Sequence, residues 1–306
     1  MKKFSSILFF IAFSYLCAVG QGSQSSITLV PAKSVAVVRV DWQKVRRDQQ
    51  LKAVVKGDEF AGIIGRTGID EASIRELVIF ADASPTTNGK MGVIVNVNRS
   101  SAAIAKYLGS KGWATENIGG RTAYIDPTDG SYLLSLRNGT FVMGTKAAVE
   151  QTLDVVAKPQ NALIRRANFR SIMSSLGTVS PINFFLGVPE EYRGVANFGY
   201  KIATTLMSLA DFGILSTILD KIGLIQNFGL SINSAHGAFP VHLIAEMSGK
   251  TGAYLASGSL NLLKRGASMV AKTDADRAAL KSMTFESAGN LLSIKMDLPQ
   301  SVMAPR

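Results

Sequence analysis

The chain has 306 residues, a formal net charge of +11, 47% hydrophobic residues and 18% charged residues. This balance is typical of a globular protein with a large core, and it excludes a disordered chain. The only cysteine is Cys17, so a chain that loses its leader has no internal disulfide, thiol nucleophile or thiolate metal ligand.

The first twenty residues have the pattern of a secretory signal peptide. Lys2 and Lys3 precede an apolar run from Ile7 to about Val19, and small residues lead to a cleavage position after Gly20. We therefore predict a signal peptide over 1–20 and an exported protein, periplasmic or extracellular, of the bacterial cell envelope. Such a compartment is poor in ATP, NAD and glutathione.

Two alternatives to cleavage after Gly20 stay open. One is an uncleaved N-terminal anchor, although the apolar run is short for a membrane span. The other is a lipoprotein modified at Cys17, which is disfavoured because Tyr15 and Leu16 stand where a lipobox has small residues.

The first half predicts strands and helices in alternation. After a polar lead over 21–26, Asp41 is the expected N-cap of a helical stretch that reaches about residue 65, Ser100 or Ser101 caps a second helix, and Thr145 caps a third. The pairs Gly119-Gly120 and Asn138-Gly139 are typical hairpin turns. The strands are predicted at 35–40, 77–81, 91–97, 113–118, 121–125, 132–136 and 141–143.

The second half repeats this order. Strands are predicted at 182–186, 228–232, 239–247 and 292–298, a long helical region at 190–224, and a helix at 251–270. Val38 corresponds to Phe184, Ile79 to Leu230 and Val97 to Met247, with spacings of about 150 residues that suggest an internal duplication.

These patterns predict an α+β fold of two similar units. Each unit is expected to be a mainly antiparallel sheet with helices on one face, the first over 21–158 and the second over 159–306, with the break near Pro159. The alternative is a single continuous sheet that both halves share.

The first half also resembles a family of uncharacterised exported bacterial proteins that carry a domain of unknown function. The resemblance lies in Leu29-Val30-Pro31-Ala32 before the strand at 35–40, and in Gly144-Thr145-Lys146-Ala147 at the start of a helix. It covers about half of the chain and implies no known activity.

No catalytic, metal or cofactor motif is complete. Gly249-Lys250-Thr251 ends like a phosphate-binding loop, but Ile244 stands where that loop needs a glycine, so a helix start capped by the Thr251 or Ser248 hydroxyl is expected. We therefore predict no nucleotide, no other cofactor and no nucleic-acid partner, with the dispersed basic residues forming solvated helix faces.

The histidines and acidic pairs also favour structural roles. His236 lies in a predicted turn, and His242 lies on a strand face with Glu246, where the two could form a surface ion pair; the spacing needed for a metal site or a catalytic elbow is missing. Asp126 and Asp129 fit a plain turn better than a calcium loop. Asp274 and Asp276 fit a helix N-terminus.

The segment 196–230 is unusually rich in apolar residues. We predict that it contributes an apolar contact surface, whose members are Phe198, Leu206, Phe212, Leu215 and Leu219. The leading hypothesis is a non-enzymatic envelope protein that binds a protein partner or a lipid-like apolar ligand, with an anionic membrane surface as a further contact. The alternative is a hydrolase of an envelope polymer or ester, which requires a serine and His242 or a carboxylate brought together by the fold.

Overall fold

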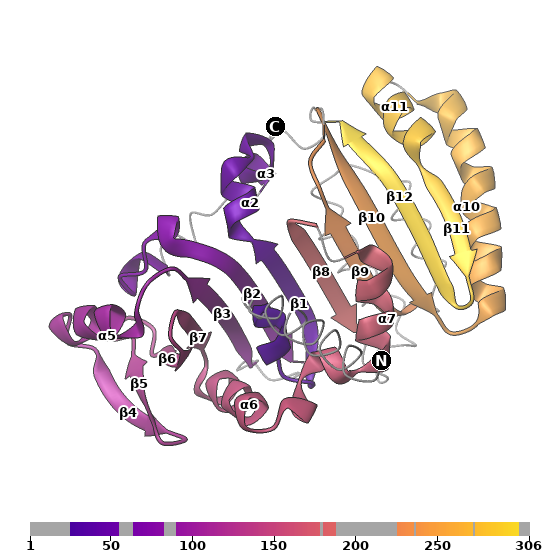
Figure 1. Cartoon of the computed structure of the whole chain (residues 1–306). Coiled ribbons are helices and arrows are strands. Elements are labelled where there is room, and N and C mark those ends of the chain that lie inside the picture. The colour runs from indigo at the N-terminus through magenta and orange to yellow at the C-terminus, as the bar shows by residue number, and fades with distance from the viewer. Residues whose placement is uncertain are drawn as a thin grey trace, which may run out of the picture.

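The computed structural model describes residues 25–54, 64–82, 90–177, 180–187, 225–235, 237–271 and 273–299. Twelve strands of these residues form one sheet in the order β11-β12-β10-β9-β8-β1-β2-β3-β7-β6-β5-β4, and every neighbouring pair is antiparallel (Figure 1). The predicted α+β class with antiparallel pairing is confirmed. The strands form one continuous sheet, which is the alternative arrangement stated above.

The strands of the first half are β1 (Ser34–Asp41), β2 (Ile74–Asp82), β3 (Met91–Val97), β4 (Ala114–Ile118), β5 (Arg121–Ile125), β6 (Tyr132–Arg137) and β7 (Thr140–Gly144). Those of the second half are β8 (Ile182–Gly187), β9 (Ile225–Ile232), β10 (Ala238–Met247), β11 (Thr284–Ala288) and β12 (Leu291–Pro299). Both predicted glycine-containing turns are present, and the φ angles of Gly119, Gly120 and Gly139 are +58°, +77° and +72°.

The two halves meet at the pair β1–β8, where Val38 lies directly opposite Phe184. From this pair β2 and β3 continue on one side, and β9 and β10 continue on the other. The order is therefore symmetric about the residues that the sequence spacing had matched. The internal duplication and the division into two units stay predictions, and they are consistent with this order.

Helices cover both faces of the sheet, whereas the sequence predicted helices on one face. The α7 face carries α6 (Lys146–Ala157), α7 (Ala167–Leu176) and the short 3-10 helix η1 (Ser26–Leu29). The opposite, α10 face carries α2 (Trp42–Arg47), α3 (Gln49–Val54), α5 (Ser101–Ser110), α10 (Lys250–Val270) and α11 (Asp274–Ser282). The reason is visible in β2, where Leu77 is buried on one face and Val78 and Phe80 on the other.

Each predicted cap in the first half is made by a side chain. Asp41 accepts from the backbone N–H of Lys44, Ser100 from that of Ala103, and Thr145 from that of Ala148. The helical stretch after Asp41 is interrupted at Asp48, which separates α2 from α3. The predicted helical region at 190–224 and the signal peptide lie outside the described residues. No described helix has the length and apolar character needed to cross a membrane.

Candidate functional site

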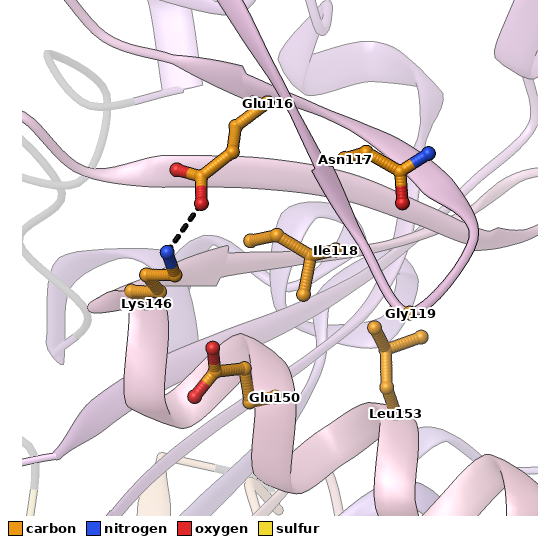
Figure 2. Close-up of a pocket in the computed structure, with 7 residues that line it drawn as sticks. All are labelled: Glu116, Asn117, Ile118, Gly119, Lys146, Glu150 and Leu153. Carbon is orange, nitrogen blue, oxygen red and sulfur yellow. Dashed lines mark hydrogen bonds and ion pairs between the residues drawn. The ribbon is translucent and has the colours of Figure 1, made fainter.

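Two pockets lie on opposite faces of the first half. The edge pocket lies on the α7 face, between the end of the β4–β5 hairpin and the first turns of α6, and it has a volume of about 320 Å³. Figure 2 shows side chains of β4 and α6 converging on it. The lining residues are Glu116, Asn117, Ile118, Gly119, Lys146, Glu150 and Leu153.

One ion pair organises the polar end of the edge pocket. The Glu116 carboxylate accepts from Lys146 Nζ, and its Oε2 accepts from Tyr132 Oη at 2.9 Å. The Lys146 hydrogen bond lowers the pKa of Glu116, and the same bond raises the pKa of Lys146. The bond from Tyr132 raises the pKa of that phenol. These charge-assisted hydrogen bonds hold the Glu116 carboxylate in place at the polar end of the pocket.

Glu150 lies one turn beyond Lys146 on α6 and points to the same pocket (Figure 2). It forms no hydrogen bond or ion pair with any residue in the described part of the chain. Ile118 and Leu153 supply apolar surface beside it, and Ile118 is buried. The edge pocket therefore offers one carboxylate without a hydrogen bond from the described residues, near Lys146 and beside apolar surface.

The α5 pocket lies on the α10 face, between α5 and strands β5 to β7, with a volume of about 250 Å³. Its walls are mainly apolar, and its rim holds two serines whose Oγ atoms are 2.7 Å apart, Ser101 and Ser135. The full lining is Ser101, Ala102, Ile104, Ala105, Leu108, Thr122, Tyr124, Leu133, Ser135 and Phe141. An apolar cavity with a few polar groups is the usual form of a small-molecule site.

His242 does meet a serine. Its Nε2 lies 2.9 Å from Ser293 Oγ on the neighbouring strand β12. Burial lowers the pKa of His242, as does the charge of Lys295, while a hydrogen bond to the backbone of Leu176 raises it. Neither pocket includes this pair. The ion pair suggested for His242 and Glu246 is wrong, because the Glu246 carboxylate accepts from the amides of Asn227 and Asn290.

The Asp126–Asp129 loop is held by Arg66, whose guanidinium lies 3.2 Å from Asp126 and 2.9 Å from Asp129. The sequence reading of a plain turn is consistent with this arrangement. Among the described residues no group of acidic, histidine or cysteine side chains is placed to hold a metal ion.

Of the two helix N-termini predicted in the second half, one is confirmed and the cap expected at the other is wrong. Asp274 and Asp276 lie at the N-terminus of α11 as predicted, where Thr273 and Asp276 form a capping box. The hydroxyl cap expected at the start of α10 is wrong, because Gly249 is the N-cap residue there and no side chain caps it.

The five residues of the predicted apolar contact surface lie outside the described residues, as does His236. The structure instead exposes apolar side chains on α10 that the sequence analysis did not select, namely Tyr254, Leu255 and Leu262. They lie outside the stripe of Ala253 and Leu260, which faces the core. The sequence signal that could have identified these exposed residues is their helical spacing, which differs from that of the core-facing stripe.

No family model and no curated protein matches the sequence. The structure is similar to that of TP0453 in its crystal forms III and IV, with a TM-score of 0.50 and 12% sequence identity in each case. The match covers 93% of this chain and 98% of that chain for form III, and 91% and 94% for form IV. At this identity the likeness shows the α+β fold alone.

Proposed function

We propose that the protein is an exported, non-enzymatic component of the bacterial cell envelope that binds a protein partner or an apolar ligand. The export signal at 1–20 supports the compartment. The observation that carries the binding function is the α5 pocket, which combines a mainly apolar lining with the hydroxyls of Ser101 and Ser135.

The volume of the α5 pocket limits how much of a ligand it can enclose. Its volume of about 250 Å³ is below the usual range of roughly 300–1,000 Å³ for sites that enclose a whole small molecule. It suits one apolar group, such as a ring or the end of an acyl chain, with the rest of the ligand outside. The hydroxyls of Ser101 and Ser135 lie where they can hydrogen-bond a polar group at the pocket rim.

Filling the pocket tests this proposal. Ala105→Phe places a ring in the pocket, and Ala157→Phe places the same ring at an exposed position of α6 outside both pockets. Purified protein is titrated with a fluorescent fatty acid, and native mass spectrometry identifies any lipid that co-purifies from the native envelope. Ala105→Phe is expected to abolish binding and Ala157→Phe to leave it unchanged. Equal binding by both variants, or none by the unmodified protein, would refute the α5 pocket as the site.

A hydrolase is the second candidate, and the contact of His242 with Ser293 favours it. In that reaction His242 Nε2 would take the proton of Ser293 Oγ as the hydroxyl attacks an ester. Screening ester substrates against the unmodified protein and the His242→Ala variant tests it. Turnover that the substitution abolishes would support the hydrolase, and turnover that survives it would exclude this pair.

The basic charge supports a further contact with an anionic membrane surface. Flotation with vesicles that contain or lack anionic lipid, at low and high salt, tests this contact. Binding that requires anionic lipid and disappears at high salt is expected. Equal absence from every floated fraction would refute it.

A further inference from the structure

The two edge strands of the sheet differ in whether a described element covers them. At one edge α10 covers β11, where Ser257 Oγ and Asn261 Nδ2 donate to the backbone carbonyl of Phe285 at 3.1 and 3.4 Å. At the other edge β4 pairs with β5 and with no other strand of the described chain (Figure 1). Uncovered edges invite pairing with another chain, and natural proteins usually protect them.

Strand register identifies the backbone groups of β4 that no described strand uses. A two-residue turn closes the pair Ile118–Arg121, so the backbone groups of Ile118, Glu116 and Ala114 face β5. Those of Thr115 and Asn117 consequently point to the open edge. The same alternation in β11 makes Phe285 point outward, which agrees with the contacts that its carbonyl receives from α10.

The open edge lies directly beside the edge pocket. Glu116 and Ile118 of β4 line this pocket together with Glu150 and Leu153 of α6. A strand added to β4 would place every second side chain on this face of the sheet. Glu150 forms no hydrogen bond or ion pair with the described residues, although its charge acts on Lys146, one turn earlier on α6. Its carboxylate can therefore still accept hydrogen bonds from a cationic side chain, while Ile118 and Leu153 offer contact to an apolar one.

We propose that the β4 edge binds an extended peptide segment of a partner protein by adding it to the sheet as an antiparallel strand. An antiparallel strand meets Ile118 first and Glu116 two residues later. The expected sequence of the bound segment, from its N-terminus, is therefore an apolar residue, any residue, and then lysine or arginine. The backbone of Thr115 and Asn117 supplies hydrogen bonds, and the edge pocket supplies selectivity. This inference is independent of the α5 pocket.

Selection from a displayed library of random heptapeptides on the purified protein tests the proposal. Thr115→Pro removes an outward N–H that the β4–β5 ladder does not use, so the fold is expected to persist. Ser287→Pro makes the matching change on β11, whose edge α10 already covers. We expect enrichment of the apolar-x-basic pattern. The selected peptides should bind Thr115→Pro at least about tenfold more weakly and Ser287→Pro with unchanged affinity.

Two further measurements keep the test decisive. Glu150→Gln should weaken binding several-fold and reduce its dependence on salt, whereas Glu286→Gln on β11 should not. Amide exchange at Thr115 and Asn117 should slow when a selected peptide is added, a readout that stands even where the proline variant fails to fold. No enriched peptide, peptides without a basic residue, or binding that leaves both amides unprotected would overturn the proposal. Dimerisation of the unmodified protein through these amides would also overturn it, because the occupant would be a second copy.

Discussion

Replacing Glu76 with alanine should destabilise the protein and release the 3-10 helix η1 from the sheet. The Glu76 carboxylate accepts from Arg39 Nε at 2.6 Å, from Ser25 Oγ at 2.8 Å and from the backbone N–H of Ser26 at 2.5 Å. It therefore connects β2 to β1 and holds η1 on the α7 face of the sheet. Without it, the one hydrogen bond left to the Arg39 side chain from the described residues would be a long contact of 3.5 Å to the carbonyl of Ser180.

The magnitude follows from burial. Removing one member of a buried ion pair costs about 3–5 kcal/mol, since the other charge is left without a partner. The side chains of Arg39 and Glu76 retain 18% and 12% exposure, so water can solvate part of the remaining charge. We expect the free energy of unfolding to fall by about 2–4 kcal/mol.

Urea denaturation measures this loss, and limited proteolysis with mass spectrometry locates new cleavages near η1. Glu76→Gln should have an intermediate effect, because its amide oxygen can still accept from the N–H of Ser26. Glu286→Ala is the control, since Glu286 on β11 forms an exposed pair with Lys295 at 4.0 Å, and such pairs contribute little. If Glu76→Ala matched Glu286→Ala in both assays, the network would not stabilise the fold and the reasoning would fail.

Three other outcomes are expected. Gly229→Ala should lower stability by about 1–3 kcal/mol in urea, because the new Cβ would lie 2.2 Å from Ile172 Cγ2 of α7; an unchanged midpoint would show that α7 can move away. Burial lowers the pKa of His242, so on acidification the histidine binds a proton more readily in the unfolded chain than in the folded one, and stability should fall as pH drops below about 6.5. His242→Gln should flatten this dependence of stability on pH, and an identical dependence would contradict the reasoning. Gly139→Ala should cost at least roughly 1–2 kcal/mol, because its φ is +72° and the new Cβ would lie 2.7 Å from the carbonyl oxygen of Val97; an unshifted thermal midpoint would argue against strain at this turn.

Local structure was determined by the sequence itself. The caps at Asp41 and Thr145 depend on a side chain and an N–H three residues further on. The turns at Gly119-Gly120 and Asn138-Gly139 depend on backbone angles that glycine adopts readily. Such features involve only neighbouring residues, so chain order alone contains the information. The strands at 35–40 and 91–97 were visible for the same reason, because their pattern of side chains is local.

The candidate sites were decided by the tertiary structure. The sequence analysis described 21–26 as a polar lead, yet Ser26 is fully buried, and its N–H donates to the carboxylate of Glu76, fifty positions later. The edge pocket likewise forms only when β4 brings Glu116 to Lys146 of α6. The continuous sheet depends on the pairing of β1 with β8, for which no local pattern exists. Long-range pairing is selected by which apolar faces can be buried together, and that choice is made by the folded chain as a whole.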